Sequence, residues 1–336
     1  MEKLKIITFE EHASDKAIAE AGSKIVEKAF PNIRHMFDPN MTANPPEGTL
    51  FDFGKRRIAD MDAAGIAMQI ISYSNYTQWI PADEAVPLAR DANDRLAAAV
   101  AANPDRFGGF ATLPWSNPEK AAKELERAVT SCHLQGALIT GRPSTDAVFL
   151  DDARYTPVFE AAEQLGVPVY VHPGLPCLSL QKDYYGGFSP LVETSFSLYG
   201  WGWHAEAGIQ LIRMILGGLF DKFPRLNVIA GHWGEMIPFF LDRLDMAMPK
   251  RMTGLKHEIS EYFKKHVYVT PSGMFSNAQL RFTLDTVGAD RILYSVDYPY
   301  INGNGAAKFL EEAPIAQEEK EMIAHSNAEK LLNLCK

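Results

Sequence analysis

The chain has 336 residues, of which 46% are hydrophobic and 22% are charged, so it can build a large core and is not a disordered chain. Its 33 basic and 42 acidic residues give a net charge of −9, which argues against nucleic acid or an anionic membrane surface as the partner. No linker, repeat or low-complexity segment divides the sequence. We therefore expect one domain over residues 1–336.

The cysteines and the N-terminal segment indicate the compartment. Cys132, Cys177 and Cys335 are an odd number, lie far apart and form no CxxC pair, so a disulfide framework or a thiolate zinc site is not expected. The first residues, MEKLKIITFEEH, carry acids where a signal peptide is apolar, and no stretch reaches the length of a membrane span. These features predict a cytoplasmic protein with no membrane partner.

Short runs rich in β-branched and aromatic residues recur along the chain and predict strands. Most of them are apolar without clean alternation, as in parallel strands that are covered on both faces. The predicted strands are Leu4–Phe9, Ala67–Tyr73, Phe107–Leu113, Gly136–Thr140, Val167–Val171, Leu226–Ala230, Val267–Thr270 and Ile292–Val296.

Helical patterns lie between these strands. They are predicted over Ala85–Ala102, Pro118–Ser131, Ala153–Leu165, Ile209–Phe220 and Glu235–Ala247. Eight strands that alternate with helices fit either a closed barrel or an open, doubly wound sheet. No GxGxxG or GxxxxGK[ST] motif is present, so a nucleotide-binding open sheet loses support and a (β/α)8 TIM barrel is the prediction.

Two long segments with little strand pattern are predicted to be loops, the first of them a candidate lid over the mouth of this barrel. Residues 13–57 are rich in Pro and Asn and form the long first β/α loop, with room for short helices and a role as a lid. The second long loop runs from Pro173 to about Trp203.

Polar residues collect where several predicted strands end, and TIM-barrel enzymes place their active sites at that end. Glu10, Glu11 and His12 follow the first strand, and alternation in an extended segment would point Glu10 and His12 inward and Glu11 outward. The remaining strand-end residues are His172, His232 and Asp297. Carboxylates and histidines that converge on one mouth suit zinc, manganese or a similar divalent ion.

Each of these residues also has a purely structural interpretation. A lone His after a strand commonly hydrogen bonds or caps a neighbouring element, and Asp297 before Tyr-Pro could start a turn. His204 follows Trp-Gly-Trp, and a packed or exposed role is expected for it ahead of a role in the pocket. The four strand ends taken together carry more weight than any single residue. No G-x-S-x-G motif supports a serine nucleophile.

Several motifs resemble those of the amidohydrolase-2 group, which includes metal-dependent hydroxybenzoate, 5-carboxyvanillate and aminocarboxymuconate semialdehyde decarboxylases. The similarity covers nearly the whole chain except the first long loop. The matching motifs are Glu10-Glu11-His12, His172-Pro173, Gly231-His232-Trp-Gly-Glu235 with Pro238, and Ser295-Val-Asp297-Tyr-Pro299.

The resemblance implies a role for each matching position. Glu10, His12, His172 and Asp297 match the family's metal ligands, and His232 with Glu235 matches its pair after strand six. Glu-x-His on the first strand resembles the hydroxybenzoate and carboxyvanillate branch. The fourth strand contains no lysine to form a bridging carbamate, so a single divalent metal is expected, zinc or manganese, with magnesium also open.

The resemblance also suggests how the substrate is held. Arg243 matches an arginine near the substrate, although a helix-surface salt bridge is nearly as good an interpretation. Aromatic side chains of the loops and strand ends could stack on a planar ring, and Tyr73 and Trp201 are the candidates, together with Trp79, Tyr185 and Trp203.

The function that follows is decarboxylation of an ortho-hydroxylated aromatic acid. The metal would chelate the carboxylate and the phenolate while an acid protonates the ring carbon. Asp297 is the donor that the resemblance offers, and His232, oriented by Glu235, is its competitor. The alternatives are a single-metal hydrolase of a lactone, ester or amide, and a barrel that only binds a ligand. Homo-oligomers, dimers or tetramers, are expected from the family.

Overall fold

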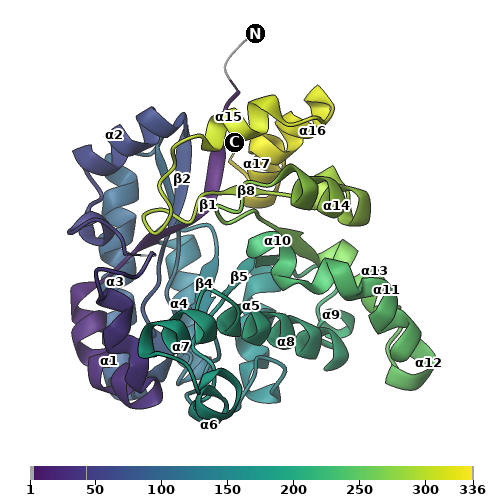
Figure 1. The fold of residues 1–336 in the computed structure, drawn as a ribbon, viewed down its shortest axis with the longest axis horizontal. Coiled ribbons are helices and arrows are strands. Elements are labelled where there is room, and N and C mark those ends of the chain that lie inside the picture. Colours follow the sequence, from purple (N-terminus) through teal and green to yellow (C-terminus); the bar gives the residue numbers. More distant parts are fainter. Residues whose placement is uncertain (1–3, 43, 335–336) are drawn as a thin grey trace.

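The computed structural model describes residues 4–42 and 44–334, and eight parallel strands form its centre (Figure 1). They are β1 (Ile7–Ala13), β2 (Met68–Tyr73), β3 (Phe107–Phe110), β4 (Ala137–Thr140), β5 (Val169–His172), β6 (Val228–Ala230), β7 (Val267–Val269) and β8 (Tyr294–Ser295). They pair in the orders β3-β2-β1-β8 and β4-β5-β6-β7. Parallel bridges Ala111–Ala137 and Val269–Ile292 join these two groups at both edges. The strands therefore close the predicted TIM barrel.

Helices connect the strands and surround the barrel (Figure 1). The longer ones are α1 (Lys16–Ala29), α2 (Lys55–Ala64), α3 (Ala82–Ala102), α4 (Pro118–Thr130), α5 (Thr156–Leu165), α7 (Pro190–Ser197), α8 (Gly202–Leu216), α11 (Ile237–Ala247), α13 (Ile259–His266) and α14 (Asn277–Val287). Shorter ones are α6 (Leu178–Leu180), α9 (Leu219–Lys222), α10 (His232–Glu235), α12 (Lys250–Thr253), α15 (Ala306–Glu312), α16 (Gln317–Glu321) and α17 (Asn327–Leu332).

The predicted helix over 209–220 differs most from the structure. Helix α8 begins seven residues earlier, at Gly202, and ends at Leu216. Gly217 then follows, and Gly218 has a φ of 72°, which an α-helix does not accommodate, so α9 is a separate turn. The earlier start matters for the site because it places His204 in the first turn of α8.

The segment 13–57 is more helical than predicted. It holds α1, which has 14 residues, and the 3-10 helix η1 (Pro31–Phe37). The Asp15 side chain caps α1 by accepting hydrogen bonds from the backbone N–H groups of Ala17 and Ile18. A small apolar cluster centred on Phe30, Trp79, Leu175 and Leu198 packs both long loops together. The two loops therefore form one packed cover.

Two further apolar clusters build the barrel. The inner one fills the barrel itself with alternate strand residues, including Phe9, Phe110, Tyr170 and Ile229. The larger one lies between the strands and the surrounding helices. The strand ends are thus held from both sides, and residues placed there have little freedom to move.

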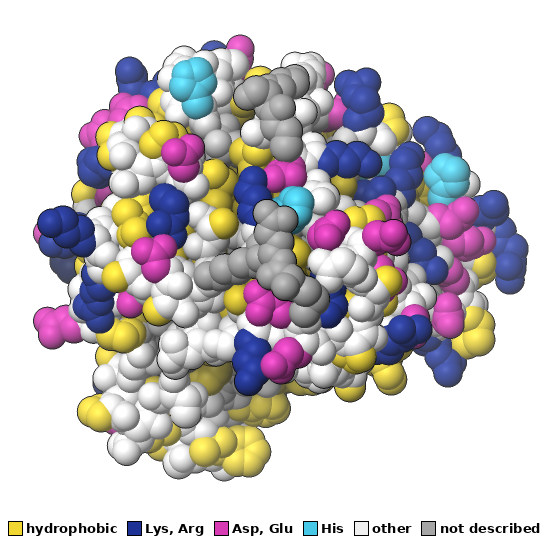
Figure 2. All heavy atoms as spheres, turned by 90° about the horizontal axis from the view of Figure 1, so that it is seen from above, with side chains coloured by type: hydrophobic (Ala, Val, Ile, Leu, Met, Phe, Trp, Pro, Cys, Tyr) yellow, Lys and Arg dark blue, Asp and Glu magenta, His cyan; other side chains and the backbone are white. Residues whose placement is uncertain are grey.

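The outer surface carries both signs of charge. Figure 2 shows the face turned toward the top of Figure 1, where basic and acidic side chains are interspersed. Cys132 and Cys177 form no disulfide, and Cys335 lies outside the described residues. Among the described helices, none is both long enough and apolar enough to cross a bilayer.

Candidate metal centre

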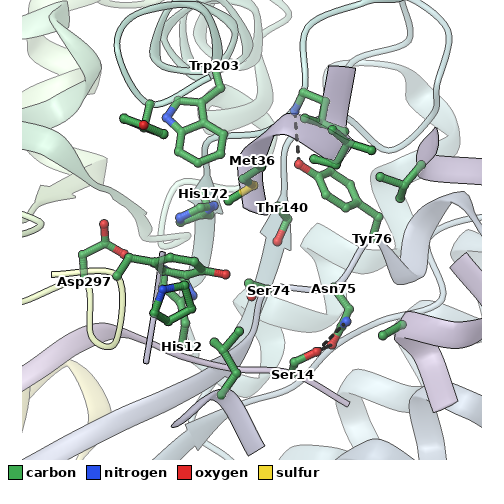
Figure 3. A pocket seen from close by; sticks show the side chains of 18 of the residues that line it. His12, Ser14, Met36, Ser74, Asn75, Tyr76, Thr140, His172, Trp203 and Asp297 are labelled. Atoms are coloured by element: carbon green, nitrogen blue, oxygen red, sulfur yellow. Dashed lines mark hydrogen bonds and ion pairs between the residues drawn. The ribbon is translucent and has the colours of Figure 1, made fainter. Parts of the chain in front are cut away.

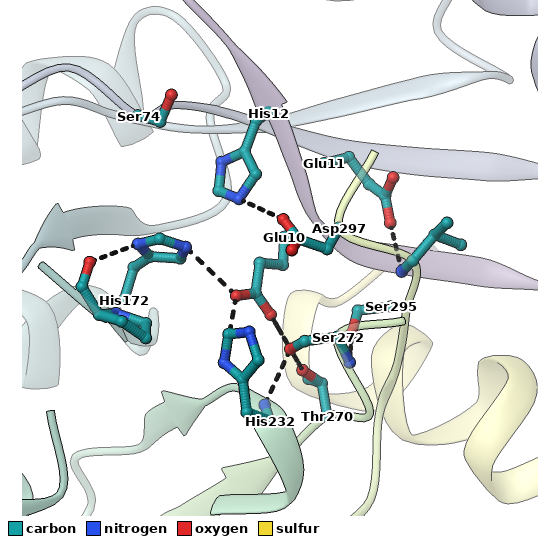
Figure 4. A network of polar contacts seen from close by, with 12 residues as sticks. Glu10, Glu11, His12, Ser74, His172, His232, Thr270, Ser272, Ser295 and Asp297 are labelled. Atoms are coloured by element: carbon teal, nitrogen blue, oxygen red, sulfur yellow. Dashed lines mark hydrogen bonds and ion pairs between the residues drawn. The ribbon is translucent and has the colours of Figure 1, made fainter. Parts of the chain in front are cut away.

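Four predicted side chains meet at the ends of three strands. Glu10 and His12 come from β1, His172 ends β5, and Asp297 follows β8. One ligand atom from each lies within 4.8 Å of those of the others. His12 Nε2 is 3.1 Å from an Asp297 carboxylate oxygen, and His172 Nε2 is 3.3 Å from Glu10 Oε1 (Figure 4).

A bulge in β1 sets the direction of these side chains. The pairing of β1 with β2 shifts between Thr8 and Glu11, and Glu10 has a φ of 58°. Glu10 and His12 therefore share a direction, as predicted, but through a bulge and not through regular alternation. Glu11 points elsewhere and is fully buried, so it is not a solvated carboxylate.

Glu11 joins β1 to the segment that carries Asp297. Its Oε1 accepts a hydrogen bond from the Val296 backbone N–H at 2.9 Å, and its Oε2 accepts one from Gln69. Burial raises the pKa of Glu11 to about 8, against the opposing effects of the Val296 hydrogen bond and the Arg57 charge. Glu11 holds the neighbouring Asp297 in place without being part of the cluster.

The two oxygens of Glu10 have different neighbours, because hydroxyl groups surround Oε2 and the histidines of the cluster lie nearest to Oε1. Oε2 accepts hydrogen bonds from the hydroxyls of Tyr170, Thr270 and Ser272. Gly231 makes room for this arrangement, because a Cβ at that position would lie 2.8 Å from both Glu10 Oε2 and Ser272 Oγ. The hydroxyls fix the carboxylate so that Oε1 faces the centre of the cluster.

The four residues suit a divalent cation. Glu10 Oε1 and both ring nitrogens of His12 are buried and form no hydrogen bond of good geometry among the described residues; their nearest polar neighbours are His172 Nε2 for Glu10 Oε1 and Asp297 for His12 Nε2. Burial raises the pKa of Glu10, and the neighbouring His232 and His12 offset this effect only in part, so a further positive charge would stabilise its anionic form. Burial and the neighbouring His12 and His232 hold the pKa of His172 well below its usual range, so its imidazole is neutral, as a ligand must be.

A second carboxylate organises two histidines beside this cluster. The Glu235 carboxylate contacts His232 Nδ1 at 2.8 Å through one oxygen and His204 Nδ1 at 2.9 Å through the other. Burial opposes charge on Glu235, but the two imidazoles lower its pKa. Burial would also lower the pKa of His232, yet the charges of Glu235 and Glu10 outweigh it and raise that pKa to about 10.

A cavity of about 480 Å³ lies in front of this centre, and its lining includes His12, His172, His204, His232 and Asp297. In the view of Figure 3, His12, His172 and Asp297 lie on one side of it and Ser14, Asn75 and Tyr76 on the other. Three hydroxyl or amide side chains, Ser14, Ser74 and Asn75, form a neutral polar belt next to the histidines. A planar ring therefore has both a charged and a neutral polar wall to contact.

Three predicted substrate contacts do not lie at this cavity. Arg243 is exposed on α11, because that helix turns its other face to the barrel. Trp201 is 49% exposed, and Tyr73 is buried in the core, where its hydroxyl donates to the Ala92 carbonyl oxygen. Trp79 and Tyr185 are buried away from the cavity lining as well.

Other aromatic residues take that place. Trp203, Tyr76 and Tyr300 line the cavity, and the Tyr300 ring lies 5.5 Å from the His12 ring, centre to centre. His204, expected to pack or be exposed, also lines it, with its ring 4.2 Å from that of His232. The sequence signal for His204 was its place directly after Trp-Gly-Trp in the second long loop. Tyr300 had a clearer signal, since it lies three residues after Asp297.

The sequence and the fold both match known proteins. The profile of the family described as Amidohydrolase matches residues 35–334. The γ-resorcylate decarboxylase of Polaromonas sp. is 35% identical over 98% of both chains. A dihydroxybenzoic acid decarboxylase structure from Polaromonas sp., with bound manganese and the inhibitor 2-nitroresorcinol, has a TM-score of 0.84, with 33% identity over 99% of this chain and 98% of that one.

A further solved structure is similar over the same length. The 5-carboxyvanillate decarboxylase of Sphingomonas paucimobilis has a TM-score of 0.87, with 33% identity over 98% of this chain and 99% of that one. The similarity to these decarboxylases thus spans both the barrel and its covering loops.

The position of Gly231 gives a first prediction. Gly231→Ala should push Glu10 away from the centre, because the new Cβ would lie 2.8 Å from its Oε2. We expect the purified variant to hold less than about a tenth of the divalent metal that the parent holds, measured by elemental analysis, corresponding to roughly 1.4 kcal/mol or more of binding free energy. Gly22→Ala is the control, since its Cβ would meet only Ile80, at 3.9 Å. Equal metal content in both variants would contradict the prediction.

Proposed function

The chain belongs to the amidohydrolase family, and from this premise and the geometry of the metal centre we propose that it decarboxylates a phenolic acid with one divalent metal ion. It is a metal-dependent carboxy-lyase, because relatives of about a third identity over nearly the whole chain are decarboxylases. The hydrolytic alternative finds no support among these relatives. The observation that carries the proposal is the buried cluster of Glu10, His12, His172 and Asp297 beside a cavity that His232 also lines.

We propose Glu10, His12, His172 and Asp297 as the ligands of that ion. Two carboxylates and two imidazoles are compatible with manganese, zinc or magnesium, so the donor atoms alone do not select the metal. Manganese is our choice, supported by its presence in the similar dihydroxybenzoic acid decarboxylase structure. Since Thr140 ends β4 and no lysine lies on that strand, a carbamate-bridged second ion has no anchor there.

In the proposed reaction, a proton is added to the ring carbon that bears the carboxylate. The carbon–carbon bond then breaks, its electron pair returns to the ring, and carbon dioxide leaves. The bound cation would neutralise the carboxylate and an ortho phenolate oxygen and thereby fix the orientation of the ring. The protein's own contribution is to hold the acid near that carbon and to exclude water, and the packed cover of both long loops serves the second task.

Two side chains can hold the proton, and their surroundings differ. Asp297 follows β8, is held through Val296 by Glu11, and is one of the four proposed ligands. His232 lies outside that set, and Glu235 engages its Nδ1, which leaves Nε2 for the substrate. We propose Asp297 as the donor to the ring carbon. His232 is the competing donor, with Glu235 as its positioning residue and His204 on the other oxygen of Glu235.

The proposed working form is a single-domain, cytoplasmic homo-oligomer. Its support is a group of exposed apolar side chains on α11, α12 and α14, where Phe239 is 74% and Met252 72% exposed and Phe282 lies 5.7 Å from Phe239 between ring centres. Free Cys132 and Cys177 fit a reducing compartment. Light scattering of the metal-loaded protein measures its mass and tests the assembly directly.

The direct test is release of carbon dioxide by manganese-loaded protein. The panel holds 2,6- and 2,3-dihydroxybenzoate and 5-carboxyvanillate, each with and without a chelator. We expect at least one acid to be decarboxylated and the chelator to remove at least about nine-tenths of the rate, because the metal supplies the charge that the buried donors lack. No release from any acid by protein with confirmed metal would overturn the proposal and direct the search to lactones and esters.

The ligand assignment predicts the effect of removing one imidazole. His172→Ala should abolish stoichiometric manganese binding, because it removes one of the four donors from a buried site. His257→Ala is the matched control, since the His257 side chain is 54% exposed and lies outside the cluster. Elemental analysis after desalting measures both. Full manganese occupancy in His172→Ala would remove His172 from the ligand set.

The two proton donors are separated by a pair of variants. Asp297→Asn should reduce kcat by more than about 100-fold and also weaken metal binding, since Asp297 has both proposed roles. His232→Asn should retain the metal and still lose turnover if it positions or protonates the substrate. Single-turnover rates at saturating manganese, read with metal content, measure both effects. Near-normal turnover in Asp297→Asn would clear Asp297 of the acid role and leave it to His232.

A further inference from the structure

The cavity is larger than a hydroxylated benzoate requires. Its volume of about 480 Å³ lies within the range of roughly 300–1,000 Å³ that holds drug-sized ligands, which are bigger than a single ring with small substituents. It begins at the strand ends, where His12, His172 and Asp297 lie, and continues to α1 and η1 in the cover. A ring fixed at the metal centre therefore leaves the part of the cavity below the cover unfilled.

The lining changes character along this path. Helix α1 presents one face to the cavity, because its lining residues Ile18, Ala19, Gly22, Ser23, Val26 and Glu27 recur at helical spacing. Helix η1 presents Ile33, Met36 and Phe37. The apolar arm is defined by Ile18, Val26, Ile33, Met36, Phe37 and Leu50. Phe37 is 72% exposed, so the arm continues to the surface.

The six residues of the apolar arm are all uncharged. Among the described residues that line the whole cavity, none is Lys or Arg. The acids in that lining are Asp297, at the metal centre, and Glu27, an exposed residue on the same face of α1 as Val26. A second carboxylate of the substrate that lay among Ile18, Val26 and Met36 would lose hydrating water with no Lys or Arg in the lining to pair with, and with the like charge of Glu27 nearby. An apolar substituent meets neither cost.

We propose, on the basis of the proposed decarboxylase function, that the substrate is an ortho-hydroxybenzoate with one carboxylate and an apolar substituent, such as an alkyl chain, that lies in the apolar arm. The metal centre holds the carboxylate end, and the neutral belt of Ser14, Ser74 and Asn75 faces the ring. Each methylene buried in the arm should tighten binding about fourfold until the arm is full. Acids whose second carboxylate would have to lie in the apolar arm are expected to be poor substrates.

Binding is measured first, with ligands that cannot react. Manganese-loaded protein is titrated by calorimetry with resorcinol and with its 4-alkyl and 5-alkyl homologues from methyl to hexyl. In at least one series Kd should fall about fourfold per methylene over the first members. Resorcinols whose chain ends in a carboxylate should bind at least tenfold more weakly than alkyl homologues of equal length. A flat or rising Kd in both alkyl series overturns the inference.

A matched pair of variants tests whether the ligand's alkyl substituent lies in the apolar arm. Ser23→Lys places a cation on the cavity face of α1, whereas Ala17→Lys adds the same charge at an exposed position of α1 outside the lining. In Ser23→Lys the carboxylate-tailed ligands should bind at least threefold more tightly relative to the alkyl ligands. Ala17→Lys should leave that ratio unchanged. The placement of the substituent in the apolar arm is overturned if the affinity of carboxylate-tailed relative to alkyl ligands is the same in the parent protein and in Ser23→Lys. It is also overturned if this relative affinity changes equally in both variants.

Turnover separates this inference from the function on which it rests. The parent protein is assayed for carbon dioxide release from 2,6-dihydroxybenzoate and from its alkylated homologues. Suppose that 2,6-dihydroxybenzoate is decarboxylated but that an alkyl substituent improves neither binding nor kcat/KM. This result overturns the apolar arm and leaves the decarboxylase function intact. If the alkyl substituent tightens binding but no acid releases carbon dioxide, the apolar arm is supported and the decarboxylase function is overturned.

Discussion

Burial of the Glu10 carboxylate at the mouth of the barrel is the constraint on which the rest of the site depends. The side chain is almost wholly buried, three hydroxyls donate to one of its oxygens, and the imidazoles of His172 and His232 lie within 4 Å of the other oxygen. An isolated carboxylate in such a place is strongly unfavourable. A cation bound by Glu10 together with its neighbours would offset the free-energy cost of burying this carboxylate. The packing around Glu10 therefore favours metal binding.

The two buried carboxylates near the centre have different partners and hence different tasks. Glu10 accepts hydroxyl hydrogen bonds at one oxygen and has the imidazoles of His172 and His232 at 3.3 and 3.8 Å from the other, whereas the two oxygens of Glu235 contact imidazoles at 2.8 and 2.9 Å. The first arrangement favours a shared cation, and the second orients His232 toward the cavity. The two histidines differ in pKa for the same reason. Burial and neighbouring histidines lower the pKa of His172, while the carboxylates around His232 raise its pKa.

The backbone at these residues is in a conformation that L-residues rarely adopt. Glu10, His232, Glu235 and Asp297 all have φ between 49° and 68°, and Ser272, which holds Glu10, has a φ of 46°. Each such conformation costs of order 1 kcal/mol or more and persists only where surrounding structure enforces it. The closed barrel with its inner and outer apolar clusters supplies that enforcement. Rigid strand ends thus hold side chains in positions that an isolated segment would not keep.

The sequence by itself determined the barrel, its eight strands and the residues that could ligate a metal. Strand periodicity, the chemistry of strand-end residues and the resemblance of the motifs are local properties, so Glu10, His12, His172, His232 and Asp297 could be named without coordinates. Helix α1 was missed because a segment rich in Pro and Asn further along obscured its capped, amphipathic start.

Only the tertiary structure decided which side chains reach the cavity. Arg243, Trp201 and Tyr73 had suitable chemistry but face solvent or the core, whereas Trp203, Tyr300 and His204 line the cavity. Helix rotation and loop packing set these directions, and both depend on contacts between residues far apart in the sequence. Three further features depend on tertiary contacts in the same way, because they form only when distant segments pack together. They are the bulge at Glu10, the contact of Glu235 with His204, and the apolar arm between α1 and η1.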